Sequence, residues 1–257
     1  MKLYDYYRSS AAYRVRIALN LKQAYYQSVP ISLLDDAHNA AAYSAINPHR
    51  LVPGLDAGFA LEYGHAPDER TPGQDKRQEQ EHVNNDEQPD HHAQGVLGQS
   101  LAIIEYLDER FPEPPLLPRD LWQKARCREM ALTVACDIHP LNNLRVLNYL
   151  NTEFGVQQNE KMVWYHHWLE RGFQTLETLI SRQATALASS TRNAQETPRF
   201  CCGDTPMLAD LCLIPQLYNA KRFGFDLQAF PHLLAIEQHC LALPAFIAAH
   251  PDNVGDH

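Results

Sequence analysis

The stretch from Arg8 to Leu19 constrains the fold more than any other part of the chain. Residues 2–6 alternate in character as a short strand does, whereas apolar residues at helical spacing follow Ser10. Ser9 and Ser10 therefore fall at the N-terminus of a predicted helix. Free N–H groups and the helix dipole at such a junction stabilise an anion, for example a carboxylate or a thiolate.

Composition limits the class of protein. The 257 residues, 45% of them hydrophobic, suffice for one large domain or two ordinary ones. A formal net charge of −9 disfavours a nucleic-acid partner, because phosphate binding needs a basic face. The six cysteines lack paired C-x-x-C spacing, so we expect small buried residues in a reducing compartment and no metal site. We expect no membrane segment and a cytoplasmic location.

The N-terminal part alternates between strand and helix patterns. We predict strands at 2–6, 25–30, 52–56 and 95–97, and helices at 11–22, 40–45 and 100–111. This order is that of a thioredoxin-like α/β domain, which we place at residues 1–111. Residues 63–94 are charged and poor in large apolar side chains, which predicts a disordered insertion. We interpret its four histidines as part of this solvated loop rather than as metal ligands.

Helical periodicity dominates after the linker Pro112–Pro115. We predict amphipathic helices at 122–150, 161–187, 208–223, 232–241 and 245–249, with a polar loop at 189–197. Residues 118–257 are therefore predicted to form an all-helical second domain.

Several motifs along the chain match one family. Its signature, Ser-Ser-Cys-x-x-Arg-Val-Arg-Ile-Ala-Leu, is matched at Ser9, Ser10 and 14–19, with Ala11 in the cysteine position. Further matches lie at 47–48, 51–53, 99–107, 136–147, 203–206 and 208–210. On these motifs the chain resembles the zeta-class glutathione transferases, and the resemblance covers nearly the whole chain.

The resemblance implies glutathione as the cofactor, a two-fold homodimer, and a small dicarboxylate diketo acid as the substrate. The implied reaction is the cis–trans isomerisation of maleylacetoacetate to fumarylacetoacetate in tyrosine and phenylalanine catabolism. Three alternatives stay open: the same reaction on maleylpyruvate in gentisate catabolism, a conjugating or dehalogenating transferase, and a non-catalytic binding module.

Site residues follow from the matched motifs. The resemblance implies Ser9 as the hydroxyl that binds the glutathione sulfur, helped by Ser10, with Arg8 beside them in the catalytic group. It implies that the backbone of Val52, before a cis Pro53, pairs with glutathione as a strand would. Simple capping by the serines and an ordinary turn proline are the competing interpretations.

The remaining predicted residues bind the γ-glutamyl and glycine ends of glutathione and the carboxylates of the substrate. Gln99 and Ser100 resemble the pair that binds the γ-glutamyl group, with Ser100 also placed to cap the helix that it starts. The resemblance implies that the glycine end or the neighbouring subunit's site is reached by His38, His139, Asn142 and Asn143. For a histidine the competing interpretation is a structural role, but the polar motif around His139 favours function. The substrate carboxylates would be held by Arg8, Arg145 and Arg222.

One departure affects stability. Met207 stands where the family usually has a Ser or Thr cap, with Asp210 as its capping-box partner. We expect the missing hydroxyl to cost about 1 kcal/mol unless Thr205 replaces it.

Overall fold

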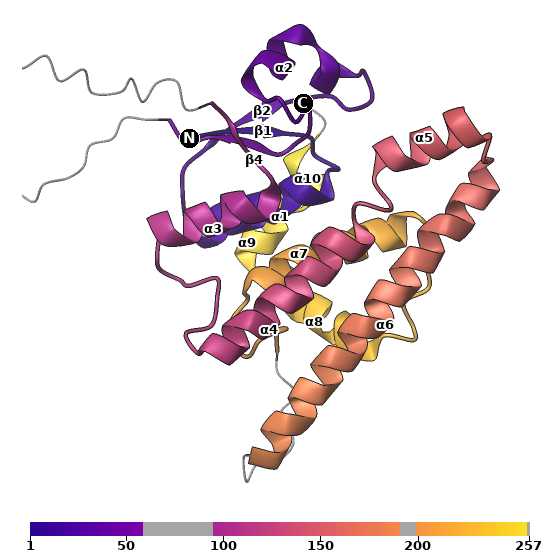
Figure 1. The fold of residues 1–257 in the computed structure, drawn as a ribbon. Coiled ribbons are helices and arrows are strands. Elements are labelled where there is room, and N and C mark those ends of the chain that lie inside the picture. Colours follow the sequence, from indigo (N-terminus) through magenta and orange to yellow (C-terminus); the bar gives the residue numbers. More distant parts are fainter. Residues whose placement is uncertain (59–94, 191–198, 256–257) are drawn as a thin grey trace, which may run out of the picture.

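The computed structural model describes residues 1–58, 95–190 and 199–255 (Figure 1). The predicted insertion at 63–94, with its four histidines, lies outside these residues. So does most of the polar run predicted as a loop at 189–197.

The N-terminal part has the predicted mixture of strand and helix. Its four-stranded sheet has the order β2-β1-β3-β4, in which β1 and β2 are parallel and the other pairs are antiparallel. Helices α1 and α3 cover one face, and α2 lies on the other side (Figure 1). The short helix η1 contacts α2. The elements are β1 (Lys2–Asp5), α1 (Ser10–Leu21), β2 (Gln27–Pro30), η1 (Ala37–Asn39), α2 (Ala41–Ile46), β3 (Gly54–Asp56), β4 (Leu97–Gly98) and α3 (Ser100–Arg110).

The rest of the described chain is helical, as predicted. It contains α4 (Leu121–Leu132), the π-helical segment η3 (Thr133–Ile138), α5 (Leu144–Phe154), α6 (Gln158–Ser190), α7 (Leu208–Arg222), α8 (Pro231–Leu241), α9 (Pro244–Ala249) and α10 (Pro251–Val254). None of the helices in the described ranges combines the length and the apolar character needed to cross a membrane. The structure therefore confirms a thioredoxin-like unit followed by a helical transferase-type unit.

The single helix predicted at 122–150 is wrong. The chain instead passes from α4 into η3, turns, and starts α5 after Asn143. Pro140 lacks the N–H that a continuing helix requires, and the Asn143 side chain caps the new helix by accepting a hydrogen bond from the Arg145 N–H at 3.1 Å. This interruption places residues 139–143 in a polar turn, followed by Arg145 in the first turn of α5, and both face the α/β part.

Helix α1 joins the two parts, since it packs against α3 on one side and against α7 and α9 on the other (Figure 1). Its residues from Ala12 to Leu19 are all buried. Arg16 forms a buried ion pair with Asp5 at 2.8 Å and donates to the carbonyl of Ala249 at 3.0 Å. The start of α1 is consequently fixed relative to the helices that cover it.

Candidate active site

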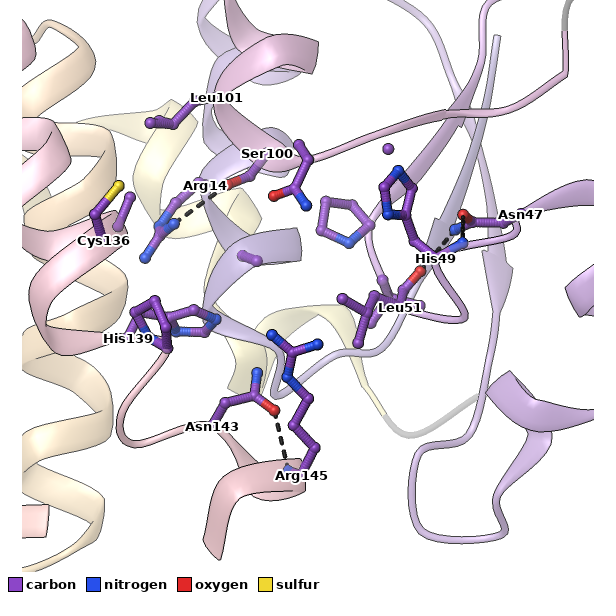
Figure 2. Close-up of a pocket in the computed structure, with 17 residues that line it drawn as sticks. Arg14, Asn47, His49, Leu51, Ser100, Leu101, Cys136, His139, Asn143 and Arg145 are labelled. Atoms are coloured by element: carbon purple, nitrogen blue, oxygen red, sulfur yellow. Dashed lines mark hydrogen bonds between the residues drawn. The ribbon is translucent and has the colours of Figure 1, made fainter. Parts of the chain in front are cut away.

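Two adjoining cavities lie between the α/β part and the helices. The larger has a volume of about 540 Å³ and the smaller about 190 Å³. They share a wall formed by Leu51, Val52, His139, Asn143 and Arg145. Figure 2 shows the smaller cavity. The larger cavity is lined by Arg8, Ser9, Ser10, His38, Val52, His139, Asn142, Asn143, Arg145 and Arg222, and the smaller one adds Pro53, Gln99 and Ser100. All residues predicted from the sequence thus gather in one region.

Ser9 is the N-cap of α1 and lines the larger cavity. Its hydroxyl oxygen accepts a hydrogen bond from the Ala12 N–H at 3.2 Å. Because capping uses an oxygen lone pair, the hydroxyl proton remains free to be donated to an anion. Capping and anion binding by Ser9 are therefore compatible, although the sequence presented them as competitors.

Ser10 makes contacts that differ from its predicted catalytic role. Its hydroxyl donates to the Pro215 carbonyl at 3.4 Å and accepts a hydrogen bond from Asn219 at 2.5 Å. Its proton is thus directed towards α7 instead of towards a thiolate. This finding corrects the assignment of Ser10 as a helper of Ser9: the residue anchors α1 to α7.

The peptide bond between Val52 and Pro53 is cis, which confirms the prediction. The preceding carbonyl, that of Leu51, accepts hydrogen bonds from the Tyr43 hydroxyl at 2.7 Å and the Asn47 amide at 2.8 Å. Neither the N–H nor the carbonyl of Val52 has a hydrogen-bond partner among the residues that the structure describes. An extended peptide can therefore pair with Val52 as an added strand does.

Gln99 and Ser100 begin α3 at the rim of the smaller cavity. The backbone of Gln99 has a φ of 66°, which is uncommon for a residue other than glycine. Helix capping by Ser100 is wrong, because Ser100 is the first residue of the helix and Gln99 holds the cap position without a side-chain bond. The Ser100 hydroxyl instead accepts a hydrogen bond from Arg14 at 3.2 Å (Figure 2).

His139 lies in the wall between the cavities. Burial, together with the nearby positive charges of Arg14 and Arg145, lowers the pKa of His139 to about 3. The imidazole is consequently neutral at physiological pH and can both donate and accept hydrogen bonds.

The two asparagines after His139 hold the turn in place. Asn142 donates to the Tyr165 carbonyl at 3.0 Å, and Asn143 caps α5. These bonds give both residues structural roles beside the ligand contacts predicted for them. They hold Arg145, the second residue of α5, at the cavity edge.

The three predicted substrate arginines lie around the larger cavity. The Arg8 guanidinium packs 4.8 Å from the Tyr7 ring centroid, and Arg222 donates to Asn219 at 3.0 Å. In the described part of the chain none of the three forms an ion pair with a carboxylate. Exposed, unpaired guanidinium groups from separate segments suit a ligand with two carboxylates.

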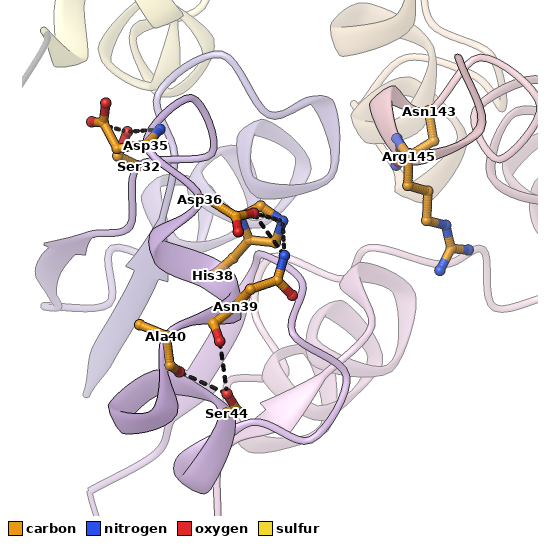
Figure 3. A network of polar contacts seen from close by, with 9 residues as sticks. All are labelled: Ser32, Asp35, Asp36, His38, Asn39, Ala40, Ser44, Asn143 and Arg145. Carbon is orange, nitrogen blue, oxygen red and sulfur yellow. Dashed lines mark hydrogen bonds and ion pairs between the residues drawn. The ribbon is translucent and has the colours of Figure 1, made fainter. Parts of the chain in front are cut away.

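His38 approaches the larger cavity from the side opposite Arg145 (Figure 3). It belongs to η1, where its Nε2 lies 3.6 Å from Asp36 Oδ1 and 3.3 Å from the Asn39 amide. Its Nδ1 is buried without a partner among the described residues. The residue lines the larger cavity, and its contact with a ligand stays a prediction.

The structure adds lining residues that the sequence analysis did not single out. Arg14 and His49 line the smaller cavity, and Tyr165, Gln216 and Asn219 line the larger one. Arg14 lies within the matched signature, but the sequence of an apolar helix does not show that its guanidinium borders a cavity. The other four come from segments whose approach depends on the tertiary fold.

Comparison with known proteins agrees with this geometry. Residues 8–110 match the family model described as "Glutathione S-transferase, N-terminal domain". A maleylacetoacetate isomerase of Pseudomonas aeruginosa is 40% identical over 258 residues, which cover 100% of this chain and 98% of that protein. A solved maleylpyruvate isomerase, described as a bacterial zeta-class glutathione S-transferase, is 36% identical with a TM-score of 0.78 and covers 98% of both chains.

The chain belongs to the zeta class of the glutathione S-transferases. A maleylacetoacetate isomerase of Methylobacterium extorquens AM1, solved with malonate and glutathione bound, is 34% identical with a TM-score of 0.77. The match covers 98% of this chain and 97% of that one.

This zeta-class chain departs from the family pattern at two positions. Ala11, in the place of the signature cysteine, lines the smaller cavity and removes any thiol from that point. Met207 is the N-cap of α7 and makes no side-chain cap bond, but the Asp210 carboxylate accepts hydrogen bonds from the N–H groups of Met207 and Cys201, both at 2.8 Å. Asp210, not Thr205, therefore satisfies the backbone at this helix start.

Proposed function

We propose that the protein is a glutathione-dependent isomerase that converts maleylacetoacetate to fumarylacetoacetate. The observation that carries the proposal is Ser9: its capping bond leaves the hydroxyl proton free at the start of α1, in a cavity that Arg8, Arg145 and Arg222 also line. The hydroxyl can donate a hydrogen bond to a thiolate, and the three guanidinium groups can bind the carboxylates of a substrate beside it.

Bound glutathione supplies a thiolate that adds reversibly to the cis double bond, so that the resulting single bond can rotate before elimination gives the trans product. Ser9 donates its proton to the sulfur, and the free N–H groups and dipole of α1 favour the same negative charge. The arginines hold the two substrate carboxylates and stabilise the enolate charge that develops during addition.

The same proposal assigns the cofactor contacts. Val52 pairs with the cysteinyl part of glutathione through its backbone, and Gln99 and Ser100 hold the γ-glutamyl group. His38 and Asn143 lie on opposite sides of the larger cavity, where they approach the glycine end (Figure 3). His139, which is neutral, contributes hydrogen bonds rather than charge.

The decisive experiment follows the loss of the enol absorbance of maleylacetoacetate with and without glutathione, with maleylpyruvate assayed in parallel. We expect glutathione-dependent turnover, faster with maleylacetoacetate, and full recovery of free glutathione. Faster turnover of maleylpyruvate would instead favour maleylpyruvate as the substrate, as in the name of the solved maleylpyruvate isomerase with a TM-score of 0.78. Consumption of glutathione would indicate a conjugating transferase, and no turnover would contradict the proposal.

We further propose a cytoplasmic enzyme with a glutathione-binding domain at 1–111 and a helical domain at 118–257. All six cysteines are free, as a reducing compartment maintains them.

We also propose a homodimer, since Leu121 and Trp122 on α4 leave 82% and 68% of their surfaces exposed, as an apolar contact face would. Analytical ultracentrifugation of the wild type and Trp122→Asp tests it. The proposal expects a dimer that the substitution weakens, and a monomeric wild type would contradict it.

A further inference from the structure

Arg14 of α1 is a buried cation without an acidic partner among the residues that the structure describes. It is 2% exposed, and its guanidinium donates one hydrogen bond, from Nη1 to the Ser100 hydroxyl at 3.2 Å. Its Nε and Nη2 are buried and have no partner in the described part of the chain. Burial lowers the pKa of the guanidinium below its ordinary value, yet arginine stays charged in proteins. A buried charge of this kind requires an anion to compensate it.

Arg16, two residues further along α1, shows how the fold treats an arginine with a purely structural role. Its Nη1 contacts both carboxylate oxygens of Asp5 at 2.8 Å, and its other nitrogens donate to the carbonyls of Ala249 and Tyr7. The chain thus neutralises Arg16 internally. Arg14, equally buried on the same helix, receives no such partner from the described residues.

The smaller cavity, which Arg14 lines, has the positive lining that an anion requires. Figure 2 shows the Arg14 guanidinium between Ser100, Cys136 and His139. Arg145 and His49 also line this cavity, whereas no Asp or Glu does so in the ranges that the structure describes. Helix α3 starts here, and its first backbone bond runs from the Ile103 N–H to the Gln99 carbonyl, so the N–H of Ser100 precedes the helical ladder.

We propose that Arg14 is a positioning residue for the γ-glutamyl end of glutathione, which orients the Ser100 hydroxyl and supplies the positive charge opposite the α-carboxylate. The inference rests on the proposed use of glutathione. Because the Ser100 oxygen accepts a bond from Arg14, its own proton is turned away from Arg14 and is available to the carboxylate. The sulfur lies at Ser9, so Arg14 acts on binding and not on the thiolate.

The test compares two ligands by calorimetry: glutathione, and 4-aminobutanoyl-Cys-Gly, which is glutathione without the α-carboxylate. For Arg14→Met we expect the Kd of glutathione to rise about 10- to 100-fold, the range for a lost bond to a charged group. The Kd of the analogue should change by less than about twofold. Arg14→Lys should recover part of the affinity, because it keeps the charge but loses the planar fork.

Ser100→Ala provides an independent variant of the same contact. If Arg14 acts through Ser100, the effects of Arg14→Met and Ser100→Ala on glutathione affinity are expected to be less than additive. Additive effects would contradict action through Ser100. Ser100→Ala leaves α1 untouched, so the two-ligand comparison can also be made on this variant alone: the Kd of glutathione should rise, and the Kd of the analogue should change by less than about twofold.

The stability of the ligand-free protein distinguishes a ligand role from a structural one. Arg14→Met is expected to unfold at the wild-type temperature or above it, because the substitution removes an uncompensated buried charge. Arg16→Met, which leaves Asp5 buried without its ion-pair partner, should unfold at a clearly lower temperature. A large loss of stability in ligand-free Arg14→Met would assign Arg14 to the fold and overturn the proposal.

Two binding results would also overturn it: an unchanged Kd for glutathione in Arg14→Met, or an equal loss of affinity for both ligands. Failure of the proposed function gives a different pattern. A wild-type protein that binds glutathione but isomerises neither diketo acid would contradict the proposed isomerase activity. The comparison of the two ligands would still test the role of Arg14, because it measures binding alone.

Discussion

Asn219 of α7 donates a hydrogen bond of 2.5 Å to the hydroxyl of Ser10, although the two residues are 209 positions apart in the sequence. The contact joins the first residue of α1 to the helix that also carries Arg222, and Arg222 in turn donates to the Asn219 side-chain oxygen at 3.0 Å. A short chain of polar contacts therefore connects the start of α1 to an arginine of the substrate cavity.

Ser10→Ala is expected to destabilise the protein by about 1–2 kcal/mol, because the partly buried Asn219 amide then loses its acceptor. Asn219→Ala should have a similar effect, and the double variant should lose less than the sum of the two, with a coupling of about 1 kcal/mol. Chemical denaturation of the three variants measures this. Ser44→Ala, which removes a hydroxyl bonded to the carbonyl of Ala40, the residue that precedes α2, at 2.6 Å, is the control and should stay within about 0.5 kcal/mol.

Gly172→Ala should disturb the π-helical segment that precedes His139. A Cβ at Gly172 of α6 would overlap the side chain of Ile138 in η3. We expect a loss of stability of about 1–3 kcal/mol, as for other overpacked cores, with a fall in kcat because His139 moves with its neighbour. Adding Ile138→Val should recover part of both losses, since it removes the overlapping Cδ1 methyl group. Unchanged stability of Gly172→Ala would contradict this close packing.

His139 makes stability depend on pH in a defined direction. Its pKa is about 3 in the folded protein against 6.5 for the ordinary side chain, so between these values the unfolded state binds more protons. Stability should therefore fall as the pH decreases from 6.5 towards 3. His139→Asn should flatten this part of the profile, as measured by denaturant unfolding at a series of pH values. An equally steep profile in the variant would show that another group is responsible.

Asp210 should contribute a slope of the opposite sign. Burial raises its pKa from 3.8 to about 6, so the folded state binds more protons between these values and stability decreases as the pH rises through them. Asp210→Asn removes this slope. It should also lower stability by about 1.5–3 kcal/mol at neutral pH, because one carboxylate accepts bonds from two backbone N–H groups. Denaturation curves for the variant at several pH values separate the two effects.

Local rules predicted much of this molecule. The junction at Ser9, the helix of 12 residues after it and the cis bond before Pro53 all followed from matched motifs or from periodicity. The break in the helix predicted at 122–150 was not predicted. The apolar spacing continues through Pro140, but the helical backbone cannot continue there. Capping by Asn143 competes with periodicity, and it prevails because Pro140 has already ended the preceding helical segment.

The roles of Ser10 and Arg14 could not be predicted for a different reason. Both depend on what packs against α1: α7 approaches Ser10, and α3 approaches Arg14. Such partners are set by the tertiary arrangement, about which the spacing of residues within one helix contains no information.

The kinetics of Ser9→Ala test the central claim most directly, with kcat and the KM for glutathione measured for maleylacetoacetate. The account predicts that kcat falls about 10²- to 10³-fold, as when a donor to a catalytic anion is removed, while KM changes only a few-fold. Asp120→Ala, which removes the N-cap of α4 far from the cavities, controls for the roughly 1 kcal/mol of lost capping and should keep the wild-type kcat. A Ser9→Ala enzyme with wild-type kcat would contradict the account.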